Sequence, residues 1–151
     1  MKLVLASKNA HKLVEMRDIL SQLGVEVVLE SEVGVDVDVE ETGATFEENA
    51  FLKARAVMEA SGLPAIADDS GLCVDALNGA PGVYSARYGG PGLDDVGRYR
   101  LLLENMRGQL DRRCRFVSAI CCCFPNGTGW RPGGSVPAPW PRPQGGGRLR
   151  L

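Results

Sequence analysis

Short apolar runs alternate with helical patterns over the first 127 residues, and this order limits the possible folds more than any other feature of the chain. A short continuous apolar run is typical of a buried strand, whereas apolar residues that recur every three or four positions are typical of a helix. Strands interleaved with helices predict an α/β fold, here a mixed β-sheet flanked by helices. We expect strands over residues 2–6, 25–29, 65–67, 72–77 and 115–124, and helices over residues 9–23, 45–60 and 94–106.

The segments between these elements carry turn and capping signals. Residues 33–39 alternate Val with Gly or Asp, which fits either a half-exposed strand or an extended loop. Thr45 and Glu48 have the spacing of a capping box, so Thr45 is expected to begin the second helix. Residues 78–91 are rich in Gly and Pro and are expected to form a loop.

The overall composition restricts the class of protein. The chain has 151 residues, which suits one domain, and a net charge of −2. That charge gives no electrostatic reason to expect nucleic acid or an anionic membrane as the main partner. No apolar run approaches the roughly 20 residues that span a bilayer. The N-terminus has too short an apolar stretch for a signal peptide, so we expect a cytoplasmic protein.

The five cysteines do not have metal-site spacing. Three of them are consecutive, Cys121 to Cys123, and the others are Cys73 and Cys114. Consecutive strand residues alternate between faces, which also makes a poor disulfide framework. We therefore expect buried thiols in a reducing compartment.

A possible phosphate site lies between the first strand and the first helix, in Ser7-Lys8-Asn9-Ala10-His11-Lys12. A helix N-terminus offers free backbone N–H groups and the positive end of the helix dipole, and Lys8 and Lys12 add charge. The alternative is a helix cap with solvated lysines. His11, the only histidine, is expected to be an ordinary polar helix residue.

Two acidic groups could hold a metal ion. Glu40 or Glu41 lies in a stretch of acids that could supply a carboxylate for Mg²⁺, although such stretches are usually solvated faces. Asp68-Asp69-Ser70-Gly71 follows an apolar strand, where one Asp could hold a metal while its neighbour orients a water. The alternative there is an Asx-type turn.

Asn49 and Lys53 are four residues apart on the second expected helix and therefore share a face. That face could meet phosphate oxygens. A pair on the protein surface is the alternative, and the spacing alone favours it.

Four segments of the chain, taken in order, resemble the inosine/xanthosine triphosphate pyrophosphatase family. They read LASKN followed by Lys12, EETGATFEENA followed by Lys53, PAIADDSGL, and GAPGVYSARY. The resemblance extends from Lys2 to about Gly127. It implies Mg²⁺-dependent hydrolysis of ITP, dITP or XTP to the monophosphate and pyrophosphate, an elongated mixed sheet in two lobes with a central cleft, and a homodimer.

The resemblance also implies roles for individual residues. The triphosphate would be held by Lys53 and by the junction, Ser7, Lys8, Asn9, Ala10, His11 and Lys12. Glu40 and Asp69 would bind the metal, with Glu41 as a substitute for Glu40. Asp68 and Asp69 would activate water, and Ser70 would contact the substrate. A related α/β family of nucleotide pyrophosphatases, the Maf type, has Ser-Pro-Arg-Arg at the first junction, which this chain lacks.

The sequence changes in character after Gly127. We expect residues 1–127 to form the pyrophosphatase-like domain, and residues 128–151, rich in Gly, Pro and Arg, to form a disordered tail. The resembling family continues instead with Gly-Phe-Gly-Tyr-Asp and Ser-His-Arg motifs. Codons for residues 147–151 can be written that encode Gly-Gly-Phe-Gly in a shifted frame, so we expect a frameshifted, truncated C-terminus. The expected consequences are poor stability and low activity, or a remnant that at most binds phosphate.

Overall fold

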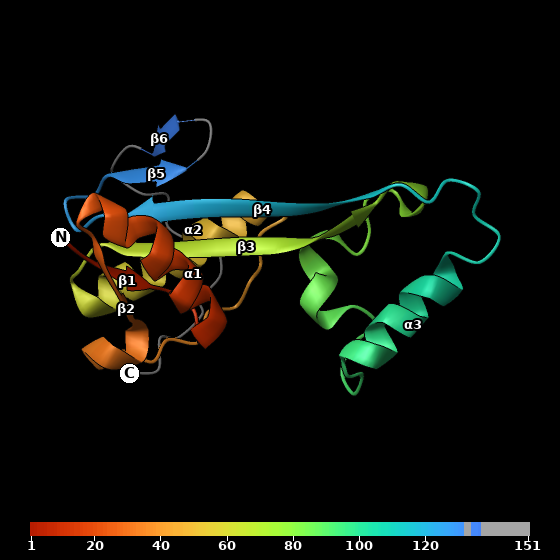
Figure 1. Cartoon of the computed structure of the whole chain (residues 1–151), viewed down its shortest axis with the longest axis horizontal. Coiled ribbons are helices and arrows are strands. Elements are labelled where there is room, and N and C mark those ends of the chain that lie inside the picture. The colour runs from red at the N-terminus through yellow and green to blue at the C-terminus, as the bar shows by residue number, and fades with distance from the viewer. Residues whose placement is uncertain (132–133, 137–151) are drawn as a thin grey trace. The chain divides into compact units, whose positions relative to one another are not determined.

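The computed structural model describes residues 1–131 and 134–136 (Figure 1). The chain divides into two compact units. The first contains Met1–Asp68 and the segment that begins at Ala119, and the second contains Asp69–Ser118. Two long strands, β3 and β4, run from one unit into the other. None of the described helices has the length and apolar character that a membrane span needs.

The first unit is built on a mixed sheet, which confirms the α/β prediction. The strand order is β2-β1-β3-β4-β5-β6. Strand β1 pairs in parallel with β2 and β3, whereas β5 pairs antiparallel with β4 and β6. The strands are β1 Lys2–Leu5, β2 Glu26–Leu29, β3 Ala65–Val74, β4 Cys114–Cys123, β5 Gly129–Arg131 and β6 Gly134–Val136.

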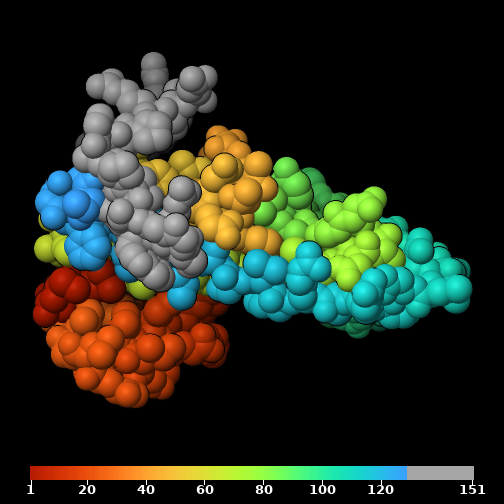
Figure 2. All heavy atoms as spheres, turned by 90° about the horizontal axis from the view of Figure 1, so that it is seen from above, coloured from red at the N-terminus to blue at the C-terminus, as the bar shows by residue number. Residues whose placement is uncertain are grey.

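Helices cover both faces of this sheet. Helix α1, Ala10–Leu20, follows β1, and helix α2, Phe46–Ser61, leads to β3. One core cluster joins Leu3 and Leu5 to Leu13 of α1, and the other joins Val4 and Ala6 to α2. Figure 1 shows α1 in front of the sheet and α2 behind it. In Figure 2 the red and orange N-terminal segment forms one continuous body. Because both faces are covered, the parallel strands read as continuous apolar runs.

The ends of the helices largely follow the capping signals. The Asn9 side chain caps α1, and the backbone N–H of Glu48 donates to Thr45 Oγ1 (3.2 Å) at the start of α2. The Glu48 carboxylate, however, accepts from the N–H of Ala44 (2.7 Å), the residue before the cap. Helix α1 ends at Leu20, earlier than predicted, and a 3₁₀ turn over Ser21–Leu23 completes the predicted segment.

The predicted end of the third strand at Asp68 is wrong. Strand β3 continues for ten residues, through Asp68 and Asp69 to Val74. The polar residues fit because burial alternates along the strand, with Asp68 and Ser70 half-buried between buried neighbours. The Asx-turn alternative is therefore wrong as well. In residues 33–39 the extended-loop alternative holds, after a 3₁₀ helix over Glu30–Val33.

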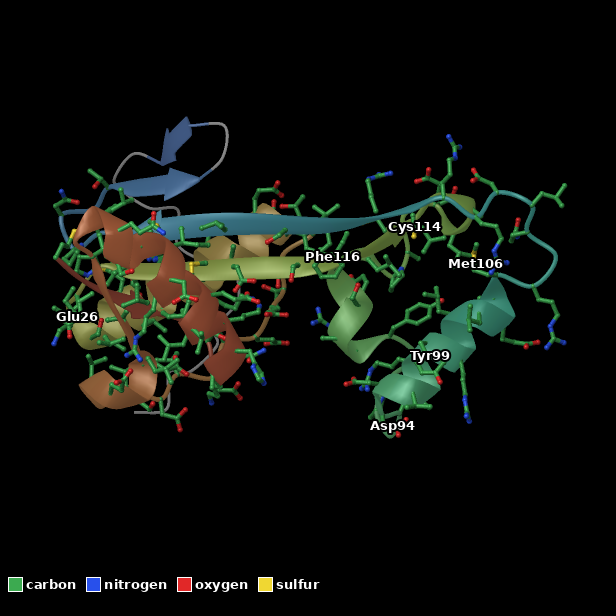
Figure 3. All side chains as sticks on the ribbon, in the orientation of Figure 1. Glu26, Asp94, Tyr99, Met106, Cys114 and Phe116 are labelled. Carbon is green, nitrogen blue, oxygen red and sulfur yellow. The ribbon has the colours of Figure 1, made fainter. Side chains whose placement is uncertain are left out.

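The second unit holds short helices and the outer parts of β3 and β4. Helix α3, Asp95–Asn105, confirms the helix predicted over residues 94–106 (Figure 3). Asp94 caps it, and its Oδ1 accepts from the N–H of Gly97 (2.7 Å). The segment predicted as a loop contains a 3₁₀ helix over Gly82–Arg87. A second 3₁₀ helix, Asp75–Leu77, follows β3 directly.

Most of the cysteines are buried, as expected, and all five are free thiols. Cys121 and Cys123 are fully buried on the α2 side of the sheet, and Cys122 packs on the α1 side, where burial raises its pKa to about 11. Cys114 is exposed, so the prediction is wrong at that position. Because strand residues alternate between faces, Cys121 and Cys123 share one face of β4 and Cys122 lies on the other.

The segment after Gly127 is only partly described. Strands β5 and β6 pair antiparallel over residues 129–131 and 134–136, where the sequence predicts no ordered element. Residues 132–133 and 137–151 lie outside the described residues, and so do most of the predicted tail and the shifted-frame segment.

Candidate functional site

A cavity of about 220 Å³ lies in the first unit, beyond the carboxyl end of β1. This is the edge of a parallel sheet at which α/β proteins bind ligands. The cavity brings together side chains from the first junction, the acidic stretch, helix α2 and strand β3. It is lined by Ala6, Ser7, Lys8, Lys12, Glu30, Val37, Val39, Glu41, Lys53, Val57 and Asp68.

Lysine–carboxylate pairs dominate the walls of this cavity. Lys12 Nζ lies 2.7 Å from Asp68 Oδ2, and Lys53 Nζ lies 2.9 Å from Glu41 Oε1. The Lys12 and Asp68 side chains are 33% and 12% exposed, so water screens their pair only partly. Lys8 also forms an ion pair, but its side chain is 64% exposed. The site thus places cationic groups and oxygen ligands within one cavity.

The first junction contributes only part of its side chains to the cavity. Ser7, Lys8 and Lys12 line it. Ser7 Oγ accepts from the N–H of Asn9 (3.1 Å), and Asn9 Oδ1 accepts from the N–H of His11 (2.9 Å). The helix-cap interpretation of Asn9 is therefore confirmed.

Ala10 and His11 are exposed and are not among the lining residues. The role of His11 stays a prediction. The two lysines are the charged groups of the junction that can reach a ligand in this cavity.

The acids of β3 separate into two environments. Asp68 lines the cavity, and its Oδ1 is buried without a hydrogen-bond partner. Asp69 is also buried, at 8% exposure, but adjacent strand residues point to opposite faces. Ser70 lies two residues beyond Asp68, on the same face of β3. The predicted water-activating pair therefore consists of two carboxylates that do not share a face.

The acidic stretch supplies Glu41 rather than Glu40 to the cavity. Glu40 is exposed, whereas Glu41 is half-buried and pairs with Lys53. Asn49 is fully buried, and its Oδ1 accepts from the N–H of Gly43 (2.7 Å). The prediction that Asn49 and Lys53 form a surface pair is wrong. Asn49 holds the backbone beside Glu41, and Lys53 lines the cavity.

Among the residues that the structure describes, no three His, Cys, Asp or Glu side chains lie together as possible ligands of one metal ion. The expected convergence of Glu40, Asp68 and Asp69 is therefore not found. Mg²⁺ nevertheless needs only one or two carboxylates, because it keeps several waters. The buried, unpartnered Oδ1 of Asp68 and the carboxylate of Glu41, on the same cavity, fit such an ion.

Glu30 is a lining residue that the sequence reasoning did not single out. It is 5% exposed, and burial raises the pKa of its carboxyl above the usual range. Glu30 also lines a second cavity of about 520 Å³, together with Ser7, Lys8 and Asp36. An acid directly after the apolar strand 25–29 is the signal that could have identified it, by the argument that applied to Asp68.

Curated relatives match most of the chain. A dITP/XTP pyrophosphatase of Haemophilus influenzae is 55% identical over 121 residues, which are 79% of this chain and 62% of the relative. Another protein of that name, from Streptomyces coelicolor, is 49% identical over 134 residues, which are 84% of this chain and 66% of the relative. The chain thus spans less than two thirds of the length of these relatives.

Solved structures match the fold. The Ham1 protein of Staphylococcus aureus has a TM-score of 0.78 and 43% identity, with 87% of this chain and 67% of that chain covered. A Ham1 protein of Coxiella burnetii has a TM-score of 0.79 and 40% identity, with 87% and 71% covered. The model of the Ham1 family matches residues 3–136. With this match and these relatives, the chain belongs to the Ham1 family.

Proposed function

We propose that the chain hydrolyses deaminated purine nucleoside triphosphates, namely ITP, dITP and XTP, to the monophosphate and pyrophosphate, with Mg²⁺ as cofactor. The proposal draws its substrate class from the relatives named dITP/XTP pyrophosphatase. The structural observation that carries it is the single cavity in which Lys8, Lys12 and Lys53 face Glu41 and Asp68.

The charges of this cavity suit a polyphosphate with a metal ion. A triphosphate brings about four negative charges near neutral pH, which lysines and a divalent cation together can offset. Lys8, Lys12 and Lys53 would bind phosphate oxygens, and Asp68 and Glu41 would hold Mg²⁺. When bound, Mg²⁺ would polarise the phosphoryl group and lower the pKa of a coordinated water.

Asp68 of β3 would act on the attacking water. The buried Oδ1 of Asp68 has no hydrogen-bond partner, and it could accept a hydrogen bond from a water and orient that water for in-line attack. Asp69 lies on the opposite face of β3, so it would support Asp68 through the strand and would not bind the same water, whereas Ser70, on the face of Asp68, would contact the substrate. Asn9, Ala10 and His11 would shape the junction, and Glu40 would stand beside Glu41 as an outer carboxylate.

The test is pyrophosphate release from ITP, XTP, GTP and ATP with Mg²⁺. We expect release from ITP and XTP above that from GTP and ATP, and a loss of roughly 100- to 10,000-fold in Asp68→Asn, the size typical of a lost acid–base group. Asp69→Asn measures the contribution of the second acid. Equal release from all four nucleotides would refute the substrate class.

A phosphate-binding protein without hydrolysis is the alternative, and the lysines of the same cavity would serve it equally well. It predicts binding of pyrophosphate with no release from any nucleotide. We also propose action in the cytoplasm, a nucleoside triphosphate substrate, no nucleic acid or membrane partner, and a homodimer. Light scattering of the purified chain tests the homodimer.

A further inference from the structure

The lysines of this chain are concentrated at one place. The chain has four lysines, Lys2, Lys8, Lys12 and Lys53, and all its other basic side chains except His11 are arginines. Three of the four line the cavity of about 220 Å³. Lysine carries a compact charge on a flexible stem, whereas arginine forms a rigid two-pronged contact. Lysine is therefore better suited than arginine to a position where the side chain must move from one anionic partner to another.

Two of these lysines hold carboxylates that a cation would need. Lys12 lies 2.7 Å from Asp68 Oδ2, and Lys53 lies 2.9 Å from Glu41 Oε1. All four side chains are between 12% and 33% exposed, so their charges are only partly screened. Lys8 differs, because it and Asp36 are 64% and 85% exposed, and such a pair is weak in water.

The charges that line the cavity balance before any ligand arrives. Its three lysines face three acids, Glu30, Glu41 and Asp68. A free divalent cation at Asp68 or Glu41 meets an ammonium group already in contact with that carboxylate. A polyphosphate without a cation draws the lysines from these acids and leaves the carboxylates without a counter-charge. Each ligand alone is therefore opposed by charges that the other would offset.

We propose that Lys12 and Lys53 block Asp68 and Glu41 until a polyphosphate draws the lysines away, so that divalent cation and polyphosphate bind cooperatively. This inference rests on the proposed function for the identity of the ligands. Binding of the polyphosphate moves each ammonium from a carboxylate to phosphate oxygens, and the released carboxylates then take the cation. By linkage, the cation raises polyphosphate affinity by the same factor.

The test measures Mn²⁺ binding to the full chain from the electron paramagnetic resonance signal of free Mn²⁺, with and without inorganic pyrophosphate. Titrations without protein correct for Mn²⁺ bound to pyrophosphate. We expect pyrophosphate to tighten Mn²⁺ binding by roughly 5- to 150-fold, the usual range of coupling between two sites.

Lys12→Met distinguishes a blocking lysine from a merely supporting one. Without its ammonium group, Asp68 is open, so Mn²⁺ alone should bind at least about fivefold more tightly and the effect of pyrophosphate should shrink. Lys12→Arg keeps the charge and should keep Mn²⁺ out. Lys53→Met repeats the test at Glu41. It replaces the first test if circular dichroism shows that Lys12→Met does not fold.

Lys2→Met is the matched control, because Lys2 forms an exposed pair with Glu26 (4.0 Å) and does not line the cavity. Unchanged or weaker Mn²⁺ binding in both Lys12→Met and Lys53→Met would overturn the inference, and so would equal tightening in Lys2→Met. Cooperative binding without ITP hydrolysis would refute the proposed function alone, and hydrolysis without cooperativity would refute this inference alone.

Discussion

Replacing Gly43 by Ala should damage the loop that carries Glu41. A Cβ at this position would lie 2.6 Å from Asn49 Oδ1, 2.7 Å from Glu48 Cβ and 3.0 Å from the backbone N of Asn49. Asn49 is fully buried in α2, so its side chain cannot swing away. The loop must move instead, which breaks the 2.7 Å hydrogen bond from Gly43 N–H to Asn49 Oδ1.

The expected loss of stability combines two effects. Overpacking a close contact costs about 1–3 kcal/mol. Leaving a buried polar group without its partner costs about 1–3 kcal/mol. Because movement of the loop relieves part of the clash, the two do not add in full, and we expect the free energy of unfolding to fall by about 3 kcal/mol.

Urea unfolding followed by circular dichroism measures this loss, and calorimetry measures pyrophosphate affinity in the presence of Mg²⁺. Gly62→Ala is the matched control at the other end of α2. Gly62 has φ of 68° with no atom within 4 Å of an added Cβ, so the change costs about 1–2 kcal/mol of backbone strain and leaves the cavity intact. Wild-type stability and pyrophosphate affinity in Gly43→Ala would show that the close approach to Asn49 does not fix the loop.

Three further outcomes follow from capping and from charge. Thr45→Ala removes the acceptor for the N–H of Glu48 and should cost about 1 kcal/mol in urea unfolding, whereas Thr45→Ser should retain most of it. Burial raises the pKa of the Glu30 carboxyl above its usual 4.5, so stability should fall as pH rises from 4.5 through the folded pKa. Glu30→Gln should remove this fall when thermal unfolding is followed as a function of pH. Hydrogen bonds from Arg113 lower the pKa of Asp111 from 3.8 to about 2. Any stabilisation of the folded protein by this carboxylate is therefore complete above pH 3.8 and is lost as pH falls towards 2. In Arg113→Gln, NMR titration should show the pKa of Asp111 return towards 3.8.

The order of elements could be predicted from the sequence because periodicity and caps are local. Asn9, Thr45 and Asp94 each cap the helix that the pattern places there. The end of the third strand could not be predicted, because Asp68 and Asp69 resemble a turn in any local window. Pairing and alternate burial, which are properties of the sheet, keep them in a ten-residue strand.

The kinds of residue in the candidate site could be predicted from the sequence, but which of them share one cavity could not. The sequence identifies Lys12, Lys53, Glu41 and Asp68, and the cavity unites them. The sequence also suggests that Asp69 acts beside Asp68. Adjacent side chains of a strand point to opposite faces, so the two carboxylates do not lie on the same face of β3. The role of Asn49 was missed because its bond to Gly43 depends on how the loop folds back onto α2.

Helix α2 also fixes how the acidic loop can vary. Glu48, Asn49 and Lys53 contact Ala44, Gly43 and Glu41 in turn. One residue added to a helix rotates everything beyond it by about 100°. A single insertion between Asn49 and Lys53 would therefore turn Lys53 away from Glu41. If Lys53 kept its place, Glu48 and Asn49 would turn away from the loop instead. A substitution can alter one of these contacts at a time, whereas a change in length alters several together. The segment from Glu41 to Lys53 should therefore keep the same number of residues in any protein that uses this cavity.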